Sequence, residues 1–184
     1  MILPVKERGQ FVATMRYMQV WLMETLARWV PTTPEMEVKL LFGEHIWDVA
    51  QHADALGKRT FELRLPLQHS VKPASAYADL LAELENAGPT PQRVAAIYDV
   101  MIPALVARYR RYLSQTDALS DAPTVRIVER FFVDSTRMID AVRSLRAELA
   151  NLQPDAAWLE NLKKREAMLE PTADAASTSA VAEA

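Results

Sequence analysis

The chain has 184 residues, half of them hydrophobic, which suits one domain with a sizeable buried core. Its formal net charge is −3, and its lysines and arginines are scattered, which argues against a surface for nucleic acid or an anionic membrane. It has no cysteine, so disulfides, thiolate metal sites and cysteine nucleophiles are excluded.

Residue usage predicts an all-α fold, because glycines number only 4 while Ala, Leu, Met, Arg and Glu, which favour helices, are plentiful. A first helix is expected over residues 7–29, where apolar side chains recur at spacings of three and four. A second helix is expected over residues 34–64, with Pro34 in its first turn. The connection between them is so short that the two helices must be antiparallel neighbours.

Residues 65–90 form a long connection that contains a short helix over 74–85. Such a crossover can lead from one helical hairpin to a second hairpin across a bundle. The third long helix is expected over 91–114, and Pro103 inside it should kink it or loosen one turn. After a turn, a fourth helix should continue to about Leu149.

Three parts are expected from this pattern. Residues 1–152 form the helical bundle, and residues 153–170 form a C-terminal amphipathic helix. Residues 171–184 are small, polar and low in complexity, so a disordered tail is expected there. No run of about 18 uncharged apolar residues occurs, and the first residues lack the apolar run of a signal peptide, so we expect a soluble, cytoplasmic protein.

Two histidines and an aspartate interrupt the apolar face of the second helix. At about 100° per residue, His45 and His52 point within about 20° of each other. Asp48 lies between them, one turn before His52, which it can orient. The fourth helix adds Asp134 to its buried stripe and Arg137 one turn later. Burying such groups without partners would cost several kcal/mol, so they must meet one another, a metal, a ligand or ordered water.

Three interpretations of these polar groups stay open. The first is a catalytic site for a small organic molecule, in which Arg137 would hold an anionic group. Its catalytic residues would be His45, His52, Asp134 and Arg137. The second is a site for a divalent metal, iron or manganese. Its ligands would be His45, Asp48, His52 and Glu44. The third is a structural network in a non-catalytic protein that forms a homodimer through exposed Trp and Leu side chains.

Other motifs and side chains point to no further functional site. A Gly-rich phosphate loop, an HExxH motif and a G-x-S-x-G motif are all missing from the sequence, so serine triads and nucleotide-binding folds are poor candidates. Trp21 and Trp47 are expected to make packing or subunit contacts. Arg59 and Arg64, near the end of the second helix, are expected to be solvated.

A resemblance to the ferritin-like superfamily rests on two runs, EVKLLFGEHIWDVAQHADALGKRTFELR and MIPALVARYRRYLSQTDALSDAPTVRIVERFFVDS. They are similar to uncharacterised bacterial ferritin-like domain proteins, in which an H-x6-H helix is followed by a P-x-V-R-I helix. The resemblance covers most of residues 10–150. It implies a ferritin-like four-helix bundle of two antiparallel helical hairpins joined by the long crossover, with the short crossover helix and the C-terminal helix added.

The resemblance also bears on the chemistry. Ferritin-like oxidases take one Glu each from the first and third helices and an E-x-x-H from the second and fourth. Here Glu44 is followed by Trp47 and Asp134 by Arg137, and the third helix has no Glu. A full dimetal site is therefore not expected. The expected function is that of a repurposed core site acting on a small organic molecule, as an atypical metal-dependent oxygenase or as a metal-free acid–base enzyme.

Overall fold

The computed structural model describes residues 3–171, and this range contains helices and no strand, which confirms the predicted all-α class. The first two long helices, α1 (Val5–Trp29) and α2 (Met36–Glu62), are joined by the short 3₁₀ helix η1 (Val30–Thr32). A crossover with α3 (Ser75–Glu85) then leads to the second half of the chain. No helix in the described range is long and apolar enough to cross a membrane.

The second half contains one interrupted helix and two uninterrupted ones. The interrupted helix consists of α4 (Thr90–Ala95), the π-helical turn η2 (Ala96–Met101) and α5 (Ile102–Gln115). It is followed by α6 (Ala122–Glu148), the short 3₁₀ helix η3 (Ala150–Leu152) and α7 (Ala156–Ala167). These bounds agree closely with the predicted helices. The tail predicted for residues 171–184 lies, from residue 172 onward, outside the described residues.

The π turn has a local cause in Pro103, the second residue of α5. Proline has no backbone N–H and its ring clashes with the carbonyl four residues earlier, which belongs to Asp99. Asp99 lies inside η2, where the helix has widened to the longer hydrogen-bond spacing of a π turn. The prediction that Pro103 loosens one turn is therefore confirmed.

The helix α2 passes through Gly57 and continues to Glu62. The end comes where the backbone of Arg64 takes a φ of 67°, and the chain then folds back over the helix. Gln68 N–H donates to Gly57 O at 3.0 Å. A Cβ at position 57 would lie 1.9 Å from Gln68 Oε1 and 2.7 Å from Arg16 Nε, so these two side chains, which bond to each other, would have to move aside for any larger residue.

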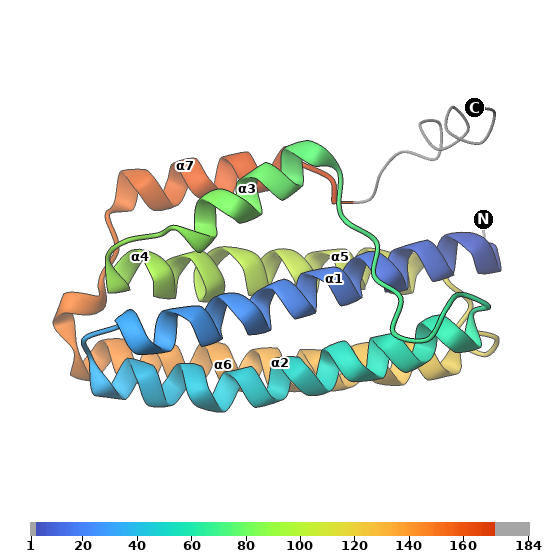
Figure 1. Cartoon of the computed structure of the whole chain (residues 1–184), viewed down its shortest axis with the longest axis horizontal. Helices are drawn as coiled ribbons and strands as arrows, with labels where there is room; N and C mark the ends of the chain where they lie inside the picture. Colours follow the sequence, from blue (N-terminus) through green and yellow to red (C-terminus); the bar gives the residue numbers. More distant parts are fainter. Residues whose placement is uncertain (1–2, 172–184) are drawn as a thin grey trace.

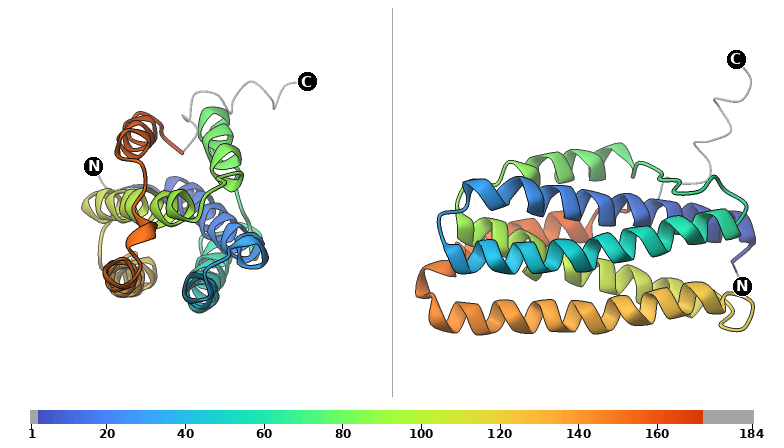
Figure 2. Two further views of the ribbon diagram at one scale, coloured as in Figure 1. Left: turned by 90° about the vertical axis from the view of Figure 1, so that its left-hand side faces the viewer. Right: turned by 60° about the horizontal axis from the view of Figure 1, so that its bottom comes forward.

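The helices lie in three layers of two. Figure 2, viewed end-on, shows α3 with α7, then α1 with α4–α5, then α2 with α6. In Figure 1, α1 and α6 run in one direction, while α2 and α4–α5 run in the other. The layer made by α1 and α5 is thus covered on both sides, which explains why 13 residues of α1 are buried.

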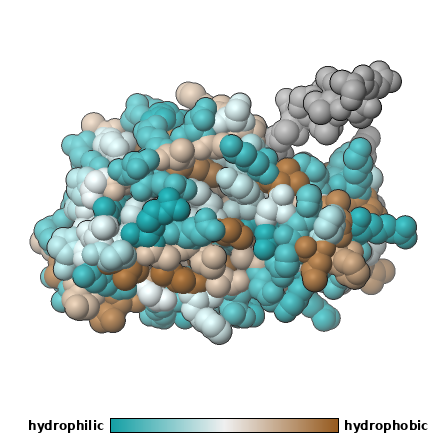
Figure 3. Space-filling model, viewed as in Figure 1, coloured by the Kyte–Doolittle hydropathy of each residue, from teal (hydrophilic) through white to brown (hydrophobic). Residues whose placement is uncertain are grey.

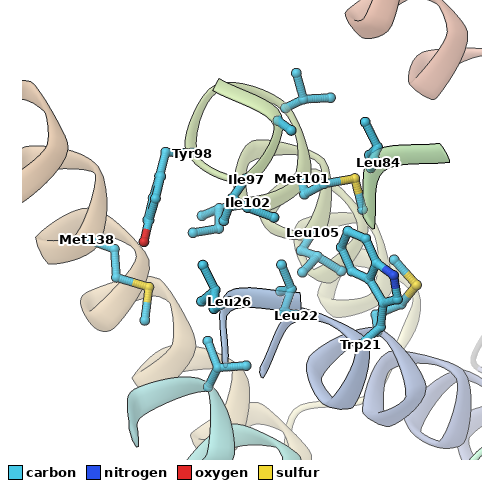
Figure 4. Packing of buried hydrophobic residues seen from close by; sticks show 14 of the residues in the cluster. Trp21, Leu22, Leu26, Leu84, Ile97, Tyr98, Met101, Ile102, Leu105 and Met138 are labelled. Atoms are coloured by element: carbon cyan, nitrogen blue, oxygen red, sulfur yellow. The ribbon is translucent and has the colours of Figure 1, made fainter. Parts of the chain in front are cut away.

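The apolar core joins these layers. Figure 4 shows Trp21, Leu22 and Leu26 of α1 packed toward the η2 and α5 side chains, with Leu84 of α3 closing one side. Most of the predicted inward stripe of the first helix is buried: Met15, Met18, Leu22, Thr25 and Trp29. Trp21 is buried, whereas Trp47 of α2 is 67% exposed.

Candidate functional site

His52 and Asp134 link α2 to α6 through a hydrogen bond. His52 Nε2 lies 2.9 Å from Asp134 Oδ2, and the histidine is 2% exposed. Burial lowers the pKa of His52. Burial raises the pKa of Asp134, but the hydrogen bonds from His52 and Arg137 outweigh it, so this pKa lies below its usual value. At neutral pH the pair is therefore an uncharged imidazole that donates its Nε2–H to a carboxylate.

This arrangement leaves the other ring nitrogen of His52 unused. With the proton on Nε2, Nδ1 carries a lone pair. That atom is buried and finds no hydrogen-bond partner among residues 3–171. On α1, Gln19 is 0% exposed, and both polar atoms of its amide are likewise buried without a partner in the described chain.

Arg137 closes the outer side of the same pair. Its Nη2 lies 3.1 Å from Asp134 Oδ1 and 2.8 Å from Asp48 Oδ2, and its Nη1 lies 3.4 Å from Glu44 Oε1. Asp48 is buried, while Arg137 and Glu44 are exposed. Because three carboxylates already surround the guanidinium, the geometry disfavours the predicted role of Arg137 in holding an anionic group of a substrate.

His45 takes a different partner, Tyr98 from the π turn. His45 Nδ1 lies 2.7 Å from Tyr98 Oη, and both residues are almost fully buried. Burial lowers the pKa of His45 to about 4, against the raising effects of Glu44 and Asp48. Burial also raises the pKa of Tyr98 well above its usual value. Both groups are therefore neutral at pH 7, and His45 can either accept the Tyr98 proton or donate Nδ1–H to the phenol oxygen.

A partly open pocket with a volume of about 390 Å³ lies beside Tyr98. Its wall also contains Asp99 of η2 and Arg146 of α6, which form a two-pronged ion pair with N–O distances of 2.8 and 2.6 Å. Figure 4 shows Tyr98 pointing from η2 toward Met138 of α6. The sequence analysis predicted neither Asp99 nor Arg146 as a site residue. The only sequence signal for a site here was Pro103, which indicated an irregular turn at this level of the helix.

The residues predicted as metal ligands are not brought to one point. His45 bonds to Tyr98 and His52 to Asp134, while Asp48 and Glu44 pair with Arg137. Within residues 3–171, no three His, Asp or Glu side chains are grouped so that they could hold a metal ion. The donor set therefore does not fit a resident iron or manganese ion.

The prediction that Arg59 is solvated is wrong. The residue is 7% exposed instead of solvated. Its Nη2 donates to Asp121 Oδ1 at 2.8 Å and its Nε to Thr124 Oγ1 at 2.8 Å. Tyr112 Oη also donates to Asp121, at 2.5 Å. This second polar cluster joins the end of α2 to the turn between α5 and α6, away from the pocket.

Comparison with family models, with curated proteins and with solved structures found no match for this chain. The resemblance to ferritin-like proteins therefore stays a prediction from the two sequence runs. Function has to be inferred from the side chains themselves.

Proposed function

We propose that the protein is a ferritin-like helical-bundle enzyme that performs metal-free acid–base chemistry on a small organic molecule. The observation that carries the proposal is the 2.7 Å hydrogen bond between buried, neutral His45 and Tyr98, whose ring lines a pocket of about 390 Å³. A pocket beside the hydrogen-bond partner of a histidine with a strongly lowered pKa is a candidate catalytic site.

The helix directions support the ferritin-like part of the proposal. The second and third long helices, α2 and α4–α5, run the same way, and the crossover with α3 connects them. One long crossover between two antiparallel hairpins is the topology expected of ferritin-like folds.

The proposed chemistry is a proton transfer through Tyr98 to His45. A proton leaving the substrate passes to Tyr98 Oη while the Tyr98 proton passes to His45 Nδ1, which leaves a substrate anion and an imidazolium. Glu44 and Asp48 favour that imidazolium, because both raise the pKa of His45. The reverse transfer returns the proton to the product.

His52 and Asp134 are positioning residues in this proposal. Their hydrogen bond fixes α2 against α6, and His45 lies two turns earlier on the same face of α2. The bond to α6 thereby keeps α2 from rotating about its axis, and this orientation of α2 directs His45 toward Tyr98.

The proposal is tested by exchange of carbon-bound hydrogen in D2O. Proton NMR would follow a panel of small ketones and keto acids with the wild-type protein, Tyr98→Phe and His45→Gln. The wild type should accelerate exchange in at least one compound, and each variant should slow it by about 10²–10⁴-fold, the usual contribution of a general acid–base group. Tyr17→Phe, at a partly exposed tyrosine of α1, is the matched control. No acceleration in any compound, or undiminished exchange in Tyr98→Phe, would refute the proposal.

A second candidate function is a non-catalytic homodimeric protein whose buried polar groups are structural. The observation that favours it is an apolar stripe on the outer face of α2, made by Met36, Leu40 and Trp47, which are 60%, 68% and 67% exposed. Figure 3 shows apolar surface gathered along the lower edge, where α2 lies. Side chains at such spacing share one helix face, which a second copy would cover.

A further inference from the structure

The pocket beside Tyr98 is lined by both apolar and charged side chains. Tyr98, Ile139, Val142 and Ala147 provide ring and aliphatic surface. The charged side chains are Asp99, Arg143 and Arg146. Two arginines and one aspartate line the pocket, and this lining favours an anionic ligand although Arg143 also pairs with Asp140 outside the lining.

Arg146 lines this pocket and has one N–H donor that takes no part in its pair with Asp99. Its Nη1 and Nη2 atoms are bound to Asp99, at 2.8 and 2.6 Å. Its Nε–H is buried and has no acceptor within the part of the chain that the structure describes. A buried N–H without an acceptor is destabilising, and an arginine N–H bonds most strongly to a carboxylate or phosphate oxygen.

Arg143 adds a second arginine to the pocket lining. This side chain is 75% exposed and pairs with Asp140, which is also more than half exposed. An exposed pair of this kind contributes little and exchanges readily with other partners. A ligand anion in the pocket would therefore meet a guanidinium that is not committed to a buried partner.

We infer that the pocket binds the carboxylate group of a small organic acid, which accepts a hydrogen bond from Arg146 Nε–H while its apolar part lies against Tyr98 and Val142. The inference rests on the proposed function, because it names the substrate class of that same site. A carboxylate suits the pocket because an apolar body and one charged end match its two kinds of lining side chain. The ligand body would then lie next to Tyr98, the hydrogen-bond partner of His45.

The direct test is a titration with benzoate, with benzamide as the uncharged probe of nearly the same shape. Two-dimensional ¹H–¹⁵N NMR resolves arginine Nε–H signals, so the shift of the Arg146 signal reports the bond itself. Benzoate should move this signal and bind about tenfold more tightly than benzamide or better, since hydrogen bonds to charged partners are the stronger ones. Equal binding of both probes, absence of benzoate binding, or an unmoved Arg146 signal would overturn the inference.

A variant separates charge from the Nε donor. Arg146→Lys keeps a positive charge beside Asp99 but removes the Nε–H, and benzoate affinity should fall about tenfold or more. Arg126→Lys, at an exposed arginine of the same helix, is the matched control and should leave the affinity unchanged. Unchanged affinity in Arg146→Lys would count against the inference. If this variant fails to fold, the wild-type titration still decides.

His45→Gln distinguishes this inference from the proposed enzyme activity. The substitution should leave benzoate binding intact, because His45 does not line the pocket. Benzoate binding without hydrogen exchange in any compound would keep the carboxylate pocket and remove the acid–base function. Exchange that is confined to neutral ketones, without benzoate binding, would keep the function and remove the substrate class.

Discussion

At the scale of single residues, the charge state of His45 is set by its burial. A histidine 1% exposed loses most of its hydration, and its pKa falls to about 4 although Glu44 and Asp48 oppose the fall. The unfolded chain keeps a pKa of about 6.5. Between these two pH values the unfolded chain binds the proton and the folded chain does not.

This difference makes stability depend on pH. The contribution of His45 is fully present above about pH 6.5 and declines as the pH falls toward 4, since the unfolded state takes up the extra proton. Going from pH 7 to pH 4.5, we expect a loss of about 2–3 kcal/mol in the free energy of unfolding. Urea denaturation at the two pH values measures it.

His45→Gln should remove most of this loss, while His69→Gln, in the loop after α2, should keep it. The pKa of His52 is lowered in the same direction, so some acid sensitivity should remain in the first variant. Equal losses in wild type and His45→Gln would show that His45 is not the titrating group.

The candidate site was predictable from the sequence only in part, and the two histidines show why. Helical periodicity alone places His45, Asp48 and His52 on the buried side of α2, where the structure has them. The partner of each depends on how the neighbouring helices are rotated and shifted. His52 meets Asp134 as expected, but His45 meets Tyr98, because the π turn changes the face that this helix presents.

At the scale of elements, Arg59 and Asp121 join α2 to the turn between α5 and α6. Periodicity could not identify this pair, because a long arginine near a helix end is usually solvated and Asp121 lies in a turn. The aspartate is 0% exposed and takes hydrogen bonds from Arg59, Tyr112 and Thr116. Removing the arginine would leave a buried, unbalanced charge.

Arg59→Met should therefore lower the free energy of unfolding by about 3–5 kcal/mol. The neighbouring substitution Lys58→Met removes a lysine whose side chain is 67% exposed and pairs only with exposed Asp54, so its cost should stay below about 1 kcal/mol. Urea denaturation at pH 7 compares the two. A cost for Arg59→Met as small as that for Lys58→Met would mean that water replaces the guanidinium.

At the scale of the whole molecule, the sequence predicted the helices better than their layers. The apolar stripes and prolines fix where each long helix begins and ends. The stripes and prolines do not show that α3 and α7 form a layer on the far side of α1 and α5. The layer of α3 and α7 depends on polar contacts between residues far apart in the sequence. Tyr77 of α3 donates to Glu166 of α7 at 2.7 Å, and Glu166 also pairs with Arg108 of α5.

In the layer formed by α2 and α6, one face of α2 has no neighbour within the described residues. This face could pair with a second copy of the chain. If a second copy covers Leu40 and Trp47, Leu40→Glu combined with Trp47→Glu should convert a dimer into a 20.7 kDa monomer. Size-exclusion chromatography with light scattering measures the mass. Leu119→Glu, at a residue 89% exposed in the turn before α6, is the control and should remain dimeric. A monomeric wild type would exclude the homodimer.

The π turn also rotates the two halves of its helix relative to each other. It contains one residue more per turn than the α-helix around it, so the helical face before it and the face after it no longer coincide. Tyr98 therefore bonds to His45 of α2 and lines the pocket, while Tyr109, farther along, packs edge-on against Phe11 and at a tilt against Phe131. The extra residue of the π turn thus lets one helix present Tyr98 and Tyr109 to different neighbours. Deleting that residue would restore a regular α-helix, in which only one of the two tyrosines could keep its partners.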